Sequence, residues 1–144
     1  MPAPMLIRTC LVLLASALLA SCGVAQCTAL CLPSAKLTLV NGTGGAVAPG
    51  LGSITVGTRT EAFDCTQGTS GAQPDGGMLF FVRCEGNKLV LDSLESRASK
   101  LTLSVAEASG TRSFSGDVTL NFSDTGREVC GTRCAEAAET VTLQ

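Results

Sequence analysis

Residues 100–106 read Lys-Leu-Thr-Leu-Ser-Val-Ala, an alternation that puts Leu101, Leu103 and Val105 on one side of an extended chain. Successive side chains of a β-strand point to opposite faces of the sheet. The stretch therefore predicts a strand with one face in a core and the other in water. The same alternation recurs in residues 35–40, so we expect a protein built from half-buried strands.

Further stretches of this kind follow one another at short spacing. The predicted strands are residues 35–40, 53–56, 60–65, 78–84, 88–91, 100–106, 117–122 and 139–143. Turn-forming residues separate them, as in Asn-Gly-Thr-Gly-Gly at 41–45. Residues 92–99 and 135–139 are each expected to form at most one helical turn. The pattern predicts an all-β fold, an antiparallel sandwich or barrel. The form that we expect is an antiparallel Ig-like sandwich of about seven strands after an N-terminal signal helix.

The first residues differ from the rest in composition. Arg8 is the only charged residue before Lys36, and residues 9–20 are almost entirely apolar. A positive start, a short apolar stretch and then small residues make a secretory signal peptide. A membrane-spanning helix needs roughly 20 apolar residues, and this run is shorter. The sequence therefore predicts export.

Residues 19–22, Leu-Ala-Ser-Cys, resemble the lipobox of bacterial lipoproteins. The resemblance implies cleavage after residue 21, a diacylglyceryl group on the Cys22 thiol and attachment to the cell envelope. Gly23 is not the aspartate that retains such proteins in the inner membrane, which implies the outer membrane. The alternative is an ordinary signal peptide that is cut after Ala25.

Cleavage at the lipobox divides the chain into three parts. These are a signal peptide over residues 1–21, the lipidated Cys22 with a tether to residue 26, and a single domain over residues 27–144. A tether of four residues spans about 13 Å when fully extended. We therefore expect the domain to sit close to the membrane.

The residue types exclude several chemistries. The chain has no histidine, whereas Ser-His-Asp hydrolases, Cys-His proteases and most catalytic zinc sites use imidazole. Loss of Arg8 with the signal peptide leaves 9 basic and 12 acidic residues, and nucleic-acid binding favours basic patches. We expect no enzyme, no cofactor, no metal and no nucleic acid. The expected protein is a monomer that binds an envelope protein or a glycan, or has a purely structural role.

Eight cysteines determine the expected covalent links. Cys10 leaves with the signal peptide and Cys22 takes the lipid. Six remain, and an even number in an exported chain predicts three disulfides. They are Cys27, Cys31, Cys65, Cys84, Cys130 and Cys134.

The spacing of the six cysteines predicts one pair and leaves two arrangements for the others. Cys65 and Cys84 end two predicted strands, and we pair them. The other four form two C-x-x-x-C motifs, one at each end of the domain. They either cross-link the two ends or close two local loops. Cross-linking is preferred because the termini of a domain often lie close together.

Two other uses of the C-x-x-x-C motifs stay open. The alternative function is an envelope thiol-disulfide protein, although its motif is one residue longer than the C-x-x-C of thioredoxin-like proteins. A four-cysteine zinc site has suitable ligands, but an oxidising compartment works against four free thiolates.

Two short motifs are expected to be turns. Asp124-Thr-Gly126 matches the aspartic-protease triplet, but that chemistry needs two aspartates that share a proton. We expect it to form a turn after a strand that ends at Phe122. Asp75, which precedes two glycines, supplies a single carboxylate, whereas calcium takes roughly six to eight oxygen ligands.

The strand and turn pattern also resembles a known family. Residues 37–50, Leu-Thr-Leu-Val-Asn-Gly-Thr-Gly-Gly-Ala-Val-Ala-Pro-Gly, followed by Ile-Thr-Val at 54–56, resemble the opening of carboxypeptidase-regulatory-like domains, which are transthyretin-like β-sandwiches. Later stretches resemble the ends of such domains in predicted bacterial lipoproteins; they are residues 101–106, 130–131 and 140–143. Residues 106–110 depart from the family's Pro-Gly-Tyr turn. The resemblance implies a non-catalytic accessory or binding role.

Overall fold

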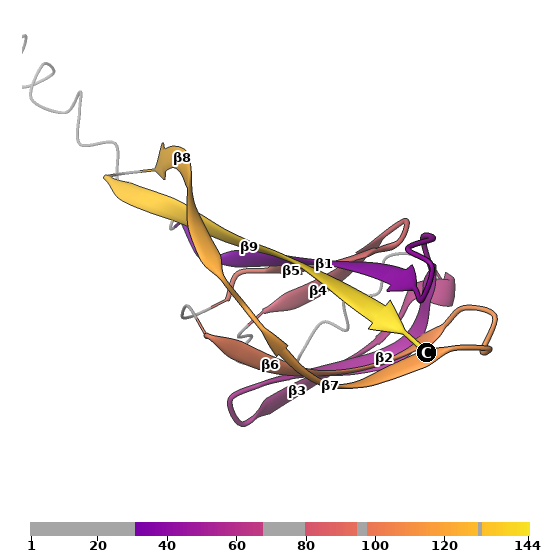
Figure 1. Ribbon diagram of the computed structural model, residues 1–144. Helices are drawn as coiled ribbons and strands as arrows, with labels where there is room; N and C mark the ends of the chain where they lie inside the picture. Colours follow the sequence, from indigo (N-terminus) through magenta and orange to yellow (C-terminus); the bar gives the residue numbers. More distant parts are fainter. Residues whose placement is uncertain (1–30, 68–79, 95–97, 130) are drawn as a thin grey trace, which may run out of the picture.

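The computed structural model describes residues 31–67, 80–94, 98–129 and 131–144. The strands are β1 (Ser34–Asn41), β2 (Pro49–Val56), β3 (Arg59–Asp64), β4 (Phe81–Glu85), β5 (Lys88–Asp92), β6 (Lys100–Glu107), β7 (Ser113–Thr119), β8 (Phe122–Val129) and β9 (Thr132–Leu143), with one 3₁₀ turn, η1 (Cys65–Gln67). They form a five-stranded sheet of order β4-β5-β1-β9-β8 and a four-stranded sheet of order β3-β2-β6-β7. The two sheets lie face to face (Figure 1).

This arrangement confirms the predicted all-β sandwich and adds to it. The described residues form nine strands, where the sequence predicted seven or eight, and one pairing is parallel. β1 and β9 run side by side in the same direction, from Ser34 opposite Glu136 to Asn41 opposite Leu143. The first and last strands of the domain thus lie together in the middle of the five-stranded sheet. The predicted signal helix lies outside the described residues.

The core forms where the alternating strands turn their apolar sides toward each other. Leu37 and Leu39 of β1 belong to the same core cluster as Ile54 and Leu103 of the other sheet, and all four are fully buried. Burying one such side chain contributes about 1.5–3 kcal/mol to stability. No polar or charged residue of the described chain is buried, so the core is aliphatic with a few phenylalanines.

Three expectations about the C-terminal third are wrong. The strand predicted at residues 117–122 breaks at Leu120, and Phe122 begins β8, which belongs to the other sheet. Residues 124–126 lie inside β8, where the register shifts against β9 and Gly126 has a φ of 74°. The left-handed glycine therefore serves a bulge in a strand, since bulges use the same conformation as turns.

The third error concerns residues 135–139, which belong to β9 and form no helical turn. Alanine and glutamate favour helices in isolation. Here the segment pairs with β1 on one side and β8 on the other, and these two ladders override its local preference.

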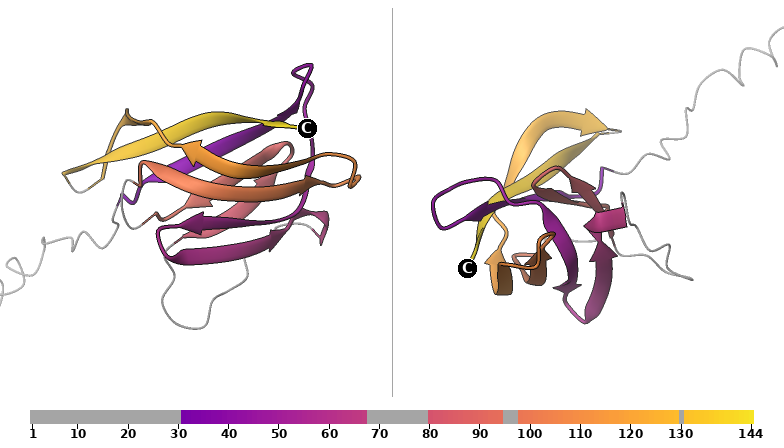
Figure 2. Two further views of the ribbon diagram at one scale, coloured as in Figure 1. Left: turned by 60° about the horizontal axis from the view of Figure 1, so that its bottom comes forward. Right: turned by 90° about the vertical axis from the view of Figure 1, so that its right-hand side faces the viewer.

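The sandwich has two distinct ends (Figure 2). The described chain enters at Cys31, and β1 leads away from that end. The turns after β1, β4 and β6 gather at the opposite end, as does Gln144. A strand of eight residues such as β1 is about 26 Å long. We call the first end the entry end and the second the loop end.

Candidate functional site

A disulfide joins Cys31 to Cys134 at the entry end, with a Cα–Cα distance of 5.2 Å and a sequence separation of 103 residues. It ties the residue that precedes β1 to the parallel strand beside it. One C-x-x-x-C motif is therefore bonded to the other, which confirms the preference for cross-linking. Cys27 and Cys130 lie outside the described residues.

The predicted pair Cys65–Cys84 is confirmed, with a Cα–Cα distance of 5.6 Å. Cys65 follows β3, which is an edge strand of the four-stranded sheet, and Cys84 lies in β4, an edge strand of the other sheet. The bond therefore clamps the two sheets together along one side of the sandwich.

The predicted lipid site and the possible calcium and zinc ligands are considered next. Cys22, its tether and Asp75 belong to parts that the structure does not describe. Within the described ranges, no helix has the length and apolarity to cross a membrane. Nor do these ranges bring three histidine, cysteine or acidic side chains together as metal ligands.

Asp124 has partners that suit a structural role. Its Oδ2 accepts a hydrogen bond from Arg133 Nη1 at 2.9 Å, and its Oδ1 accepts one from the backbone N–H of Gly126 at 2.8 Å. These contacts fix the bulge of β8 against β9. The triplet at 124–126 therefore stabilises the bulge of β8.

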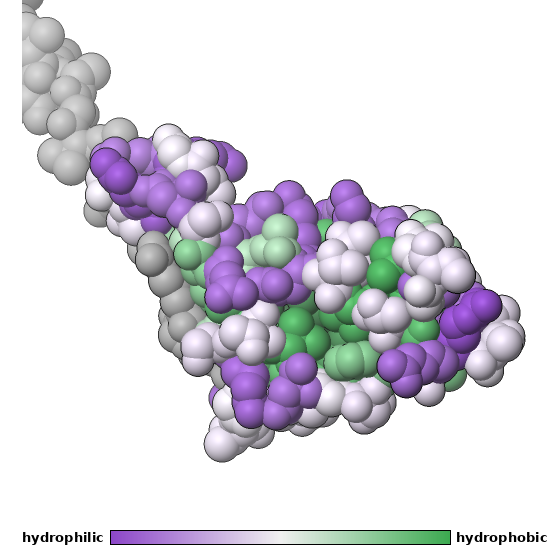
Figure 3. All heavy atoms as spheres, in the orientation of Figure 1, coloured by the Kyte–Doolittle hydropathy of each residue, from purple (hydrophilic) through white to green (hydrophobic). Residues whose placement is uncertain are grey.

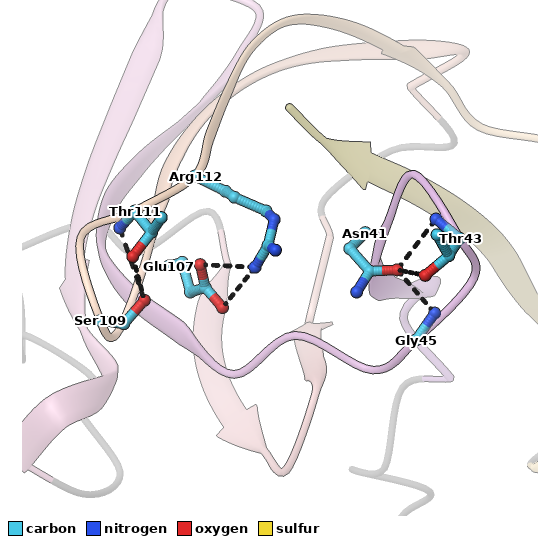
Figure 4. A network of polar contacts seen from close by, with 7 residues as sticks. All are labelled: Asn41, Thr43, Gly45, Glu107, Ser109, Thr111 and Arg112. Carbon is cyan, nitrogen blue, oxygen red and sulfur yellow. Dashed lines mark hydrogen bonds and ion pairs between the residues drawn. The ribbon is translucent and has the colours of Figure 1, made fainter.

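The loop end is held by local polar contacts (Figure 4). Asn41 Oδ1 accepts hydrogen bonds from Thr43 N, Thr43 Oγ1 and Gly45 N at 2.8–3.0 Å. In the neighbouring loop, Arg112 donates to both carboxylate oxygens of Glu107 at 3.2–3.3 Å. The two loops are therefore ordered, and each presents small exposed side chains.

A groove lies between β7 and the last part of β9, on the side opposite the Cys65–Cys84 bond. The pairing of β8 with β9 begins at Phe122, opposite Ala137. Just before Phe122, the chain crosses from the four-stranded sheet to the five-stranded sheet. β7 and β9 meet again only where Ser113 and Gln144 exchange backbone hydrogen bonds at 3.0 and 3.1 Å. Between these points the strands diverge around a volume of about 430 Å³.

The lining of this groove combines an apolar floor with a polar rim. Phe114, Val118 and Val141 form the floor. Hydroxyl, amide and carboxylate groups surround it, and no lysine or arginine is among the described residues that line it. The rim residues are Asp117, Thr119, Asn121, Glu139, Thr140, Thr142 and Gln144. Figure 3 shows the apolar side chains exposed along the seam, flanked by polar ones.

Glu139 is the unusual residue of the groove. On β9, Ala137, Val141 and Leu143 point into the core and are almost fully buried. Glu139 has the same parity as these residues, yet it carries a charge. Its Oε1 accepts hydrogen bonds from Asn121 N at 2.9 Å and Asn121 Nδ2 at 3.0 Å. The carboxylate thus lies at the groove on a strand position that otherwise holds apolar side chains.

Asp117 is the second acid of the groove, and its charge is already matched. Lys100 Nζ donates to its Oδ2 at 2.6 Å, and the Thr102 hydroxyl donates to its Oδ1 at 2.8 Å. The Lys100 contact, with the Thr102 hydroxyl second, lowers the pKa of Asp117 below its ordinary value. No lysine or arginine of the described residues pairs with Glu139, so among these residues it is the groove's unneutralised negative charge.

Lys100→Met should raise the pKa of Asp117 towards its ordinary value, because the variant removes the main stabiliser of the carboxylate. A lowered folded-state pKa stabilises the fold above the pKa of the unfolded chain, and this stability is lost as the pH falls through the folded pKa. Carboxyl-carbon NMR titration measures the pKa directly. Asp64, whose pKa is lowered by the Thr66 hydroxyl and N–H, is the control that should not move. An unchanged Asp117 pKa would refute the ion pair.

The groove was not predicted from the sequence, although one of its residues carried a signal. Residues 139–143 alternate so that Val141 and Leu143 share a side, and Glu139 belongs to that side by the same count. A charge at a core-facing position marks an edge or a site. The partner Asn121 gave no such signal, since only the folded chain brings it to β9.

None of the protein-family models, curated proteins or solved structures that were compared matches this chain.

Proposed function

We propose that this protein is a lipoprotein of the bacterial cell envelope, anchored through Cys22 to the outer membrane, whose β-sandwich is a non-catalytic interaction module. One observation carries the interaction role. The Cys31–Cys134 bond lies at the entry end, and the two ordered loops that follow β1 and β6 lie at the opposite end. A lipid nine residues before Cys31 then holds the entry end near the membrane and directs the loop end away from it.

The disulfide pattern favours this proposal over a thiol-disulfide enzyme. A redox pair within one C-x-x-x-C motif would join Cys27 to Cys31, or Cys130 to Cys134. Cys31 is instead bonded to Cys134, and the bond connects segments that belong together in one sheet. Such a cross-link holds the fold, whereas a catalytic pair must open and close.

The anchor is tested with two cysteine variants of the full chain in a bacterial host. Cys22→Ser should abolish metabolic labelling with radioactive palmitate and release the protein from the membrane fraction, because two or three acyl chains bind far more firmly than none. Cys10→Ser, which changes a thiol inside the signal peptide, should keep both labelling and membrane attachment. Equal labelling of the Cys22→Ser protein would contradict the proposal.

A further inference from the structure

We propose that the groove between β7 and β9 binds a saccharide that carries a protonated amine. The proposal deepens the interaction role and rests on it, because it names the ligand class. It does not depend on the lipid at Cys22. The groove residues that carry the proposal are all described, and the groove's volume of about 430 Å³ falls in the usual range of small-ligand sites, about 300–1,000 Å³.

The rim indicates a ligand that is rich in hydroxyl groups. Amide and hydroxyl side chains both donate and accept hydrogen bonds, as sugar hydroxyls do. Thr119, Asn121 and Gln144 are exposed at the rim and surround the apolar floor. A sugar ring offers the same combination, with polar groups around its edge and C–H groups on its faces.

The charge of the groove indicates an amine. Glu139 is half-buried, and both hydrogen bonds from Asn121 reach the same oxygen, Oε1. No donor of the described residues reaches its other oxygen, Oε2, which can accept from a ligand. Asp117 is matched by Lys100 from outside, so Glu139 supplies the unmatched charge among the described residues of the groove. An ammonium group complements this charge, and an anionic ligand would be repelled.

Contacts at its two ends define the groove. Pairing between β7 and β9 stops at Ser113 and Gln144, and Glu139 holds Asn121 at the other end. Glu139 interrupts the run of apolar core-facing positions that Ala137, Val141 and Leu143 form on β9. The same charge protects a sheet edge against unwanted strand pairing, so the experiment must separate ligand binding from edge protection.

The experiment follows backbone amide NMR shifts of the purified full chain in detergent, at about pH 6, where the sugar amines are protonated. The probes are the β-1,4-linked glucosamine disaccharide, its N-acetylated form and 1,4-diaminobutane. At about 10 mM, a ligand with a Kd of about 1 mM occupies roughly nine-tenths of the sites. The glucosamine disaccharide should shift the amides of Thr119, Asn121 and residues 139–144, and bind at least about fivefold more tightly than either other probe.

Glu139→Gln tests the residue itself. The amide oxygen of glutamine still accepts from Asn121, so the local structure is kept while the charge is lost. The variant should bind the glucosamine disaccharide about fivefold more weakly. Glu128→Gln, which removes the same charge from the exposed part of β8, should bind like the parent protein. Thermal unfolding of both variants shows that they are folded.

Three results would overturn the proposal. They are no groove shifts with the glucosamine disaccharide, equal binding of the three probes, or a Glu139→Gln protein that self-associates while its sugar binding is unchanged. Failure of the lipid anchor is a separate outcome, because Cys22→Ser changes membrane attachment and leaves groove binding as it was.

Discussion

Replacing the four terminal cysteines, Cys27, Cys31, Cys130 and Cys134, with serine should lower the free energy of unfolding by about 4.7 kcal/mol. The variant removes every cross-link between the two ends of the domain. In the chain-entropy model, a loop of roughly 100 residues accounts for about this amount, because the cross-link restricts the unfolded chain. The observed bond Cys31–Cys134 spans 103 residues. For a domain with a stability of about 5–15 kcal/mol, this loss is severe.

Cys65→Ser/Cys84→Ser is the matched control for this prediction. Its loop spans 19 residues, for which the same model gives a loss of about 3.2 kcal/mol. Urea unfolding of the three oxidised proteins gives the two differences. A four-cysteine variant that loses less stability than this control would contradict the view that the ends are cross-linked.

Gly52→Ala should cost about 3 kcal/mol of stability, although it adds a single methyl group. Gly52 lies in β2 beside the ring of Phe63 on β3. A Cβ built there would be 2.4 Å from Phe63 Cζ and 2.5 Å from the backbone oxygen of Ser104. The ring can move, but the Ser104 carbonyl belongs to the neighbouring strand β6 and moves only with its sheet. Overpacking of this kind costs about 1–3 kcal/mol, and contact with the backbone puts Gly52 at the upper end.

Gly42→Ala is the control for the same chemical change. No atom lies within 4 Å of a Cβ at Gly42, in the loop after β1. Stability should stay the same or rise by up to about 1 kcal/mol, because alanine restricts the unfolded chain. The denaturant midpoints of unfolding of both variants, compared with that of the parent protein, give the two stability changes. Equal effects at the two positions would show that the packing of β2 against β3 and β6 is looser than described.

The sequence predicted the strands better than their partners. Alternation located β1, β5 and β6 to within one or two residues, because each has one side in the core. It did not predict the parallel contact between β1 and β9, since a period of two defines which side chains face inward and not which strand lies beside them. The pairing depends on contacts between residues that are about 100 positions apart.

The candidate sites show the same division. Cys65–Cys84 was predictable, because two cysteines stand at the ends of two strands. The cross-link between the terminal motifs was one of two arrangements that remained open, and only the position of β9 beside β1 decides it for Cys31 and Cys134. The groove depends on the crossing of the chain at Leu120, where alternation predicted that one strand would continue. The local sequence pattern therefore did not predict the groove or a binding role for it.

Intact mass spectrometry of the protein from its native membrane detects the lipid and the disulfides together. We expect a chain that begins at Cys22 and carries diacylglyceryl and acyl groups, with six hydrogens lost from the other six cysteines. Without prior reduction, no cysteine should react with an alkylating reagent. A chain that begins at Gln26 without lipid, or one that takes up alkylating groups before reduction, would contradict the account of a lipid-anchored, disulfide-bonded β-sandwich.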